Sequence, residues 1–294
     1  MAASATPNPA LRGIALILGA VAIFAVMDTT AKYLGRFYPM PGVVWARYAV
    51  NLVLLVAILA VRGDWRYMRT TRPGIQVLRG MMLGSATMLF FLSLTVLPIA
   101  EAAAIGFVMP LFIALLAVPM LKERMDMPRM LAILVGLAGA LIIVRPGSAV
   151  FTPYALLPIA MAVVNALYQI LTRKLAGVEP PLTSLFFGAL VGAVMFAPVV
   201  PFAFSLPATA LHWALLLMLG TLATIGHFIL ILAYSHATAT TLAPFQYSVL
   251  VWVMVLGYVV FGDFPDHWSL AGMAVIVLSG LYLVNRQRFI VHKS

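Results

Sequence analysis

Residues 75–121 read IQVLRGMMLGSATMLFFLSLTVLPIAEAAAIGFVMPLFIALLAVPML, and in this stretch only Arg79 and Glu101 are charged. As one continuous helix the stretch would rise about 70 Å, more than twice the roughly 30 Å thickness of a membrane hydrocarbon core. The chain must therefore turn back within it, and the turn belongs at Pro98–Glu101. Residues 75–121 thus predict two membrane-spanning helices joined by a very short loop.

The rest of the chain has the same character. Of its 294 residues, 64% are hydrophobic and 9% are charged, and the mean hydropathy is +1.09. A soluble globular domain has roughly 25% charged and 45–50% apolar residues, and its surface needs many more Lys, Arg, Asp and Glu than this chain offers. The apolar surplus must face lipid, so the chain is predicted to be an integral membrane protein.

Segments of about 20 mostly apolar residues, long enough to cross a bilayer as a helix, recur ten times between turn or charged residues. The predicted fold class is therefore an all-α integral membrane protein with ten transmembrane helices. The ten segments are Ile14 to Tyr33, Pro41 to Val61, Ile75 to Leu97, Ala102 to Leu121, Pro128 to Val144, Tyr154 to Thr172, Thr183 to Phe202, Trp213 to Tyr234, Leu242 to Phe261 and Leu270 to Val284.

The net charge of +10 could indicate a nucleic-acid partner, but the basic residues lie in short loops rather than on one folded face. Cytoplasmic loops of membrane proteins carry such an excess of Lys and Arg. We therefore predict no nucleic-acid binding and cytoplasmic N- and C-termini. The termini and the alternate loops on their side hold 14 basic residues: Arg12, Arg62, Arg66, Arg69, Arg72, Arg79, Lys122, Arg124, Arg129, Arg173, Lys174, Arg286, Arg288 and Lys293; the other side holds three: Lys32, Arg36 and Arg145.

No residue pattern predicts catalysis, a cofactor or a metal. The chain has no cysteine, which excludes disulfides and thiolate metal sites. Its five histidines lack metal-ligand spacing, and no Gly-rich phosphate loop occurs. Residues Met1–Ala10 do not resemble a cleavable signal peptide, so the first apolar segment is expected to remain as a helix.

The chain aligns weakly with itself when it is shifted by 140 residues. The matches are Gly80 with Gly220, Glu123 with Asp263 and Ala140 with Gly280. Two repeats of five helices follow, and because five is odd, the second repeat must enter the membrane from the opposite side. Such inverted repeats place a site near the midplane at their interface. The predicted organisation is a tail at 1–13, repeats at 14–146 and 150–286 around a central cavity, and a tail at 287–294.

The sequence resembles the EamA-type ten-helix permeases of the drug/metabolite transporter superfamily over nearly its whole length. In the first half the matching pattern is Ile99-Ala-Glu-Ala-Ala-Ala, Pro110, Leu-Lys-Glu123 and Leu-Val-Gly136-Leu-Ala-Gly139. In the second half it is His236-Ala-Thr-Ala-Thr-Thr, Phe-Gly-Asp263, Ala-Gly272 and Ser-Gly280. The second copy departs from the pattern with Leu250 in place of the proline and an aspartate in place of the glutamate.

Within this family the chain looks most similar to the YddG-like exporters of aromatic and neutral amino acids in Gram-negative inner membranes. The resemblance implies a secondary transporter, not an enzyme, that exports small metabolites, foremost aromatic or neutral amino acids, across the bacterial inner membrane by alternating access. A drug or organic-cation exporter of the same fold is the alternative, and a membrane-embedded enzyme is a remote one. The expected partners are the small-molecule substrate and the lipid bilayer, and a monomer is compatible with this function.

One polar stripe lies on the sixth segment. Asn165, Tyr168 and Gln169 fall on one helix face with Thr172, and a polar face in lipid must point inward. This polar face either lines the substrate path or forms hydrogen bonds that hold neighbouring helices together. On the ninth segment Gln246 and Tyr247 are expected at the same membrane depth as Tyr168 and Gln169, because these two segments run in opposite directions.

Further candidate substrate-binding residues lie on three other segments. His227 is near the middle of the eighth, either lining the path or packing. Met81, Ser85 and Met88 share a face of the third and would form an adaptable apolar wall, unless the methionines only fill gaps in the core. Asp28 and Lys32 on the first and Arg47 on the second are charges within the membrane, expected either to pair structurally or to take part in binding or coupling. Asp28 is the carboxylate that a cation carrier would need.

Overall fold

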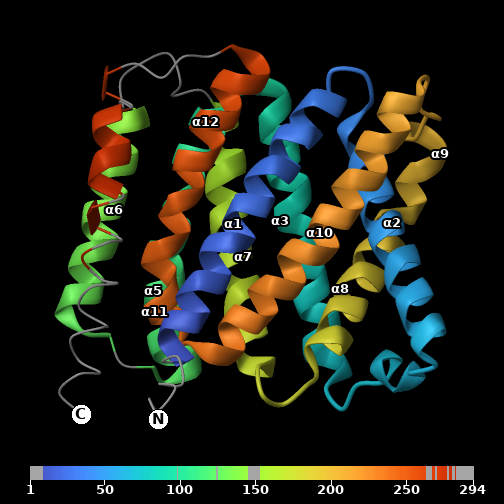
Figure 1. Ribbon diagram of the computed structural model, residues 1–294, viewed down its shortest axis with the longest axis horizontal. Coiled ribbons are helices and arrows are strands. Elements are labelled where there is room, and N and C mark those ends of the chain that lie inside the picture. Colours follow the sequence, from blue (N-terminus) through green and yellow to red (C-terminus); the bar gives the residue numbers. More distant parts are fainter. Residues whose placement is uncertain are drawn as a thin grey trace, which may run out of the picture.

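The computed structural model describes residues 9–97, 99–123, 125–144, 153–262, 267–268, 270–276, 278–279 and 282. In these residues the chain forms helices that stand side by side, with no β-strand (Figure 1). Eight helical stretches are long and apolar enough to cross a membrane, and Met130–Ile142 is a shorter apolar one. They confirm the predicted all-α membrane fold. Of the predicted tenth segment, Leu270 to Val284, the structure describes residues 270–276, 278–279 and 282.

The α-helices of the first half are α1 (Pro9–Leu34), α2 (Met40–Arg62), α3 (Pro73–Val96), α4 (Ile99–Gly106), α5 (Met109–Leu121) and α6 (Met127–Val144). Those of the second half are α7 (Leu156–Leu175), α8 (Pro181–Phe196), α9 (Val200–Ala203), α10 (Ala210–His236), α11 (Ala239–Leu242) and α12 (Val249–Phe261). Short 3₁₀ turns join them: η1 (Trp65–Met68), η2 (Pro153–Ala155), η3 (Ala197–Val199) and η4 (Ala243–Ser248).

Proline and glycine set several helix ends. Helices α2, α3 and α8 each begin with a proline in the first positions, where the missing N–H costs no hydrogen bond. Helix α2 ends at Gly63, whose φ of 63° is the left-handed conformation that glycine adopts without strain. These signals are local, and for this reason the predicted segment limits agree with the helices to within several residues.

The predicted seventh span is divided near its end into α8, η3 and α9, and two further predicted spans are interrupted at matching places in the two halves. The fourth is interrupted at Phe107–Val108, between α4 and α5, and the ninth is divided into α11, η4 and α12. Pro110 and Pro244 stand at the start of the element that follows each break, and proline cannot donate the hydrogen bond that a continuous helix requires. Both breaks lie in the fourth helix of their half. Unwound backbone at membrane depth is tolerated where it is buried in protein or lines a cavity.

The two halves pack against each other with matching helix pairs. Helix α1 packs along α10 and α7 packs along α3, so the first helix of each half contacts the third helix of the other. Likewise α2 contacts α10 and α8 contacts α3, while α2 and α8 contact each other. Helix α5 also contacts α7, as α12 contacts α1. These equivalent pairs are those of two repeats related by an approximate two-fold axis.

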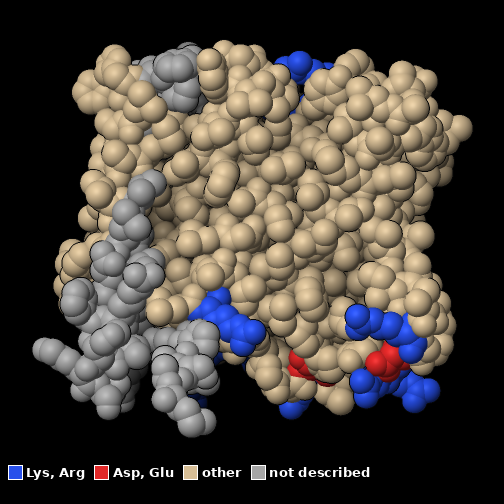
Figure 2. Space-filling model, in the orientation of Figure 1, with Lys and Arg blue, Asp and Glu red and all other residues tan. Residues whose placement is uncertain are grey.

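On the face of the molecule in Figure 2, the described residues form a wide band without charged side chains. Figure 2 shows uncharged residues across the middle of this face, and most of its Lys, Arg, Asp and Glu side chains gathered at one end. Helix α1 begins and helix α2 ends at this same end (Figure 1). The distribution agrees with a protein embedded in a bilayer, whose charged residues lie at the membrane faces.

Candidate substrate cavity

A cavity of about 150 Å³ lies where the two halves meet. The first half contributes side chains from α1, α2, α3, α4 and α5, and the second half contributes α7, α10, η4 and α12. Its walls are mostly apolar and aromatic, with Phe24, Phe90, Phe91 and Phe107 among them. Helix pairs from opposite repeats therefore enclose one central space, which is where an inverted-repeat transporter has its substrate site.

A cluster of amides lies on the second-half side of the cavity. The side chains of Gln169 and Gln246 exchange hydrogen bonds of 3.0 and 2.8 Å, so α7 and η4 do meet at one depth. Gln169 Nε2 also donates to Asn165 Oδ1 at 3.0 Å, and the Tyr234 hydroxyl donates to Gln169 Oε1. These three amides line the cavity, and each can donate to and accept from a solute.

A chain of hydrogen bonds also lies along the cavity wall. Arg79 Nη2 donates to the Tyr168 hydroxyl at 3.2 Å, and that hydroxyl lies 3.1 Å from His227 Nδ1. His227 Nε2 in turn lies 2.9 Å from Arg47 Nη2. Arg47 Nη1 donates to Thr87 Oγ1 at 3.1 Å. The chain links α3, α7, α10 and α2, and all its members except Arg79 line the cavity.

Asp28 places a carboxylate in the cavity wall. No residue that the structure describes gives this carboxylate a hydrogen bond or an ion pair. The predicted structural pair with Lys32 is wrong, because Lys32 Nζ reaches the Leu97 carbonyl oxygen at 3.2 Å and not the Asp28 side chain. The alternative, a role of Asp28 in binding or coupling, stays a prediction.

Six of the ten predicted substrate-binding residues line the cavity: Asp28, Asn165, Tyr168, Gln169, His227 and Gln246. The other four, Met81, Ser85, Met88 and Tyr247, do not. The lining residues of α3 are Leu83, Ala86, Thr87, Phe90 and Phe91, which lie on a different face of the helix from the predicted stripe.

The physical reasons for these corrections are specific. Met81 points outward, with 44% of its surface exposed, because α3 is rotated so that Gly80 and Gly84 face α8. Tyr247 is buried, but its ring stacks on Phe107 at 5.3 Å between centroids and lies against Gly136 of α6. It therefore packs behind the cavity wall and not within the cavity.

Sequence reasoning missed Arg79 and Thr87. Arg79 was counted among the basic residues near the cytoplasmic face, yet only 1% of its surface is exposed. Its Nε donates to Thr172 Oγ1 and its Nη1 to the Ser184 carbonyl oxygen, both at 2.8 Å. The available signal was its position inside an apolar segment, because charged residues within membrane helices face the protein interior.

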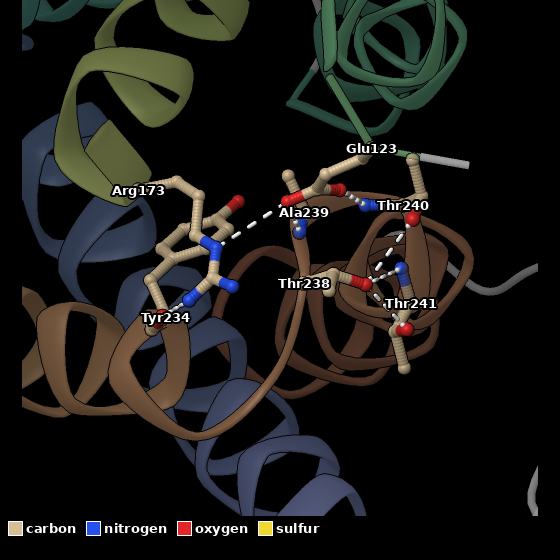
Figure 3. A network of polar contacts seen from close by, with 7 residues as sticks. All are labelled: Glu123, Arg173, Tyr234, Thr238, Ala239, Thr240 and Thr241. Carbon is tan, nitrogen blue, oxygen red and sulfur yellow. Dashed lines mark hydrogen bonds and ion pairs between the residues drawn. The ribbon is translucent and has the colours of Figure 1, made fainter. Parts of the chain in front are cut away.

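A second polar network, outside the cavity, joins the two halves at the loop after α5 (Figure 3). The Glu123 carboxylate accepts hydrogen bonds from the backbone N–H groups of Ala239 and Thr240 at 3.1 and 3.0 Å. Arg173 Nε lies 3.3 Å from Glu123 Oε1, and Arg173 Nη1 donates to the Tyr234 carbonyl oxygen at 2.5 Å. Asp263, the counterpart of Glu123 in the repeat alignment, lies outside the described residues.

Comparison with known proteins agrees with this architecture. The model of the EamA-like transporter family matches residues 11–145 and again residues 152–286. A solved crystal structure with 20% sequence identity covers 92% of this chain and 94% of its own, with a TM-score of 0.74, and so has the same fold.

Three relatives with described functions match over almost their entire lengths. An S-adenosylmethionine uptake transporter of Rickettsia conorii is 29% identical, covering 95% of this chain and 94% of that protein. A riboflavin transporter of Brucella anthropi is 29% identical, and the match covers 92% of this chain and 97% of that protein. A pseudopaline exporter of Pseudomonas aeruginosa is 27% identical, and the match covers 92% of this chain and 95% of that protein. All three carry small metabolites, and none of the three is described as an exporter of aromatic amino acids.

Proposed function

The chain belongs to the EamA-like transporter family, and on this premise we propose that it exports a small metabolite of amino-acid type across the bacterial inner membrane. The family and the relatives are transporters, so the protein is a membrane transporter and not an enzyme. The proposed solute combines charged polar groups with an aromatic or apolar body. Aromatic and neutral amino acids are the compounds of this kind that the sequence resemblance favours.

One observation carries the proposal: the same cavity is lined by a carboxylate, a guanidinium, primary amides and several aromatic rings. Asp28 and Arg47 bear opposite charges, as the two ends of an amino acid do. Gln169 and Gln246 supply hydrogen-bonding groups that can re-pair with a solute. The rings of Phe24, Phe90 and Phe107 can cover an apolar side chain, and a mostly apolar pocket with a few polar groups is typical of small-molecule sites.

The size of the cavity supports a small solute. Its volume of about 150 Å³ lies below the roughly 300–1,000 Å³ of pockets for drug-sized ligands, while an engineered cavity of similar size in another protein takes up benzene. The volume of an aromatic amino-acid side chain is of this order. Movement of the two halves against each other would open the cavity alternately to each side.

Export is the direction that the resemblance to amino-acid exporters favours. The relatives include an uptake transporter and an exporter, so direction needs its own measurement. A second candidate solute is an organic cation. It is favoured by one specific observation, the Asp28 carboxylate in the cavity wall without a hydrogen bond or ion pair from the described part of the chain.

The test is transport by purified protein in proteoliposomes, with and without a pH gradient. The panel contains labelled phenylalanine, leucine, S-adenosylmethionine, riboflavin and a quaternary organic cation. Uptake or counterflow of phenylalanine or leucine, above that of protein-free liposomes, is the expected result. Transport of the organic cation alone would favour the second candidate, and transport of riboflavin alone would contradict both. Export is tested by loading the same solute inside inverted membrane vesicles and right-side-out vesicles.

A further inference from the structure

Two charged side chains of opposite sign line the cavity without a direct counter-charge. Asp28 receives no hydrogen bond or ion pair from the described residues, and Arg47 contacts no carboxylate among them. Only 1% of the Arg47 surface is exposed, and its Nε is buried with no hydrogen-bond partner in the described part of the chain. Charged groups inside a membrane are costly and are usually paired. Neither group therefore has an ion-pair partner among the described residues, and a bound solute can supply one to each.

The position of the Arg47 guanidinium is determined by its neighbours. It lies over the Tyr48 ring, with 4.7 Å from Cζ to the ring centroid, and it bonds to Thr87 and His227. A guanidinium has only donors, so His227 Nε2 must accept the hydrogen bond from Arg47. The imidazole proton then resides on Nδ1, which donates to the Tyr168 hydroxyl at 3.1 Å. His227 is therefore a neutral imidazole that links Arg47 to Tyr168, with both ring nitrogens hydrogen-bonded.

Arg79 holds the other end of this chain. Its guanidinium makes three hydrogen bonds, to Thr172, to Ser184 and to the Tyr168 hydroxyl, and lies 4.9 Å from the Tyr168 ring centroid. A hydroxyl oxygen that accepts from Arg79 and from His227 has both lone pairs engaged. Tyr168 therefore orients His227, and His227 orients Arg47. Arg79 itself does not line the cavity.

We propose that the cavity recognises the two ends of a zwitterionic solute separately, with Arg47 binding the carboxylate and Asp28 binding the ammonium group. In this arrangement Arg79 is a positioning residue that acts through Tyr168 and His227. The Arg47 guanidinium has five N–H groups, of which the described residues engage one with Thr87 and one with His227, and charge-assisted hydrogen bonds from a guanidinium to a carboxylate are the strong ones. This inference rests on the proposed function and specifies which atoms of the solute each residue contacts.

The test is calorimetric titration of the full-length protein in lipid nanodiscs with three ligands. L-Phenylalanine has both charges, L-phenylalaninamide lacks the negative one, and N-acetyl-L-phenylalanine lacks the positive one. In Arg47→Gln we expect the Kd for phenylalanine to rise on the order of tenfold to a hundredfold, the range for a lost hydrogen bond to a charged group. The Kd for phenylalaninamide should change by less than about threefold, because that ligand has no carboxylate to lose.

Asp28→Asn should give the reverse pattern: binding of phenylalanine and of phenylalaninamide should weaken, and binding of N-acetylphenylalanine should not change. Arg79→Lys should reproduce the Arg47→Gln selectivity, because a lysine cannot make the three hydrogen bonds that orient Tyr168. Arg47→Lys keeps the charge and should retain part of the phenylalanine affinity. The matched control is Val259→Ala, at a position that is 71% exposed on α12, and it should bind all three ligands like the wild type.

The outcomes separate the two proposals. If the wild type binds and transports no amino acid, the proposed function fails and this inference fails with it. If the wild type binds phenylalanine but Arg47→Gln weakens the binding of all three ligands equally, only the inference fails. If Arg47→Gln loses phenylalanine binding selectively, its retained binding of phenylalaninamide excludes unfolding as the cause. Equal weakening of all three ligands by Arg79→Lys would reduce Arg79 to a purely structural role and overturn that part of the inference.

Discussion

Gly80 and Gly220 make equivalent contacts in the two halves of the molecule, each against a valine of the opposite half. A Cβ atom added to Gly80 on α3 would lie 2.6 Å from Val191 Cβ on α8. One added to Gly220 on α10 would lie 2.5 Å from Val50 Cβ on α2 and 3.1 Å from the Arg47 carbonyl oxygen. Small residues allow membrane helices to approach closely, and here they bring α2 and α10 together beside the cavity.

Substitution of either glycine should destabilise the protein. We expect Gly80→Ala and Gly220→Ala each to cost about 1–3 kcal/mol, the usual range for overpacking, because the neighbouring helix must move. Thermal unfolding in detergent measures this as a lower Tm. Gly19→Ala is the matched control, since nothing lies within 4 Å of a Cβ at Gly19, and it should be neutral or slightly stabilising. Equal Tm values for all three variants would contradict the close-packing account.

Glu123→Gln should also lower stability. A glutamine has one acceptor oxygen and no charge, so it cannot serve both backbone N–H groups and Arg173. We expect a loss of about 1–3 kcal/mol, seen as a lower Tm, because a largely buried charged acceptor is removed. Asp64→Asn is the control: its ion pair with Arg66, whose side chain is 73% exposed, should contribute almost nothing. A Tm for Glu123→Gln as high as that of Asp64→Asn would show that the network is dispensable.

Substitutions in the amide cluster and at Tyr247 should have different effects. Gln169→Ala and Gln246→Ala remove groups that line the cavity, so we expect transport to fall on the order of tenfold, the cost of one to two hydrogen bonds. Tyr247→Phe should leave transport unchanged and stability equal or slightly higher, because the Tyr247 hydroxyl is buried and has no hydrogen-bond partner among the residues that the structure describes. Initial transport rates in proteoliposomes, normalised to protein, compare the three. Impaired transport in Tyr247→Phe would mean that its hydroxyl does reach the solute.

The loop after α7 should be sensitive to acid. Burial alone would raise the pKa of the Glu179 carboxyl, but hydrogen bonds from the Thr71 N–H at 2.8 Å and the Thr71 hydroxyl at 2.6 Å outweigh it, and the net pKa lies below the ordinary 4.5. The stabilisation is therefore present above pH 4.5 and is lost as the pH falls through the lower pKa of the folded state. We expect the Tm difference between the wild type and Glu179→Gln to shrink between pH 6 and roughly pH 3. A difference independent of pH would contradict the assignment.

The charge asymmetry of the loops predicts cytoplasmic termini and ten spans. By the predicted segments, fourteen basic residues fall on one side and three on the other, and the asymmetry persists when the buried Arg79 is set aside. Such a difference orients membrane proteins with the basic side in the cytoplasm. An alkaline-phosphatase fusion after Ser294 should be inactive, and a green fluorescent protein fusion at the same position should fluoresce. A phosphatase that is active there would require another number of spans or the opposite orientation.

The membrane fold could be predicted because its main constraint is local. Lipid offers no hydrogen bonds, so each crossing segment must satisfy its own backbone and must be apolar over about 20 residues. Composition alone therefore revealed the spans, and proline and glycine marked several of their ends. The face of α7 that carries Asn165, Tyr168 and Gln169 was also predictable, because polar residues in an otherwise apolar helix must point inward.

What only the tertiary structure decided is how the other helices are rotated and what their polar groups contact. Helix α3 carries polar residues on two faces, Arg79 and Thr87 beside Leu83 and Ser85 beside Met81, so its sequence leaves two candidate faces for the cavity. In the structure Gly80 packs against Val191 of α8 and Leu83 lines the cavity. The hydrogen bonds from Arg79 to Tyr168 and from Arg47 to His227 join residues 89 and 180 positions apart. No local pattern encodes such pairs, because they depend on the docking of one repeat against the other.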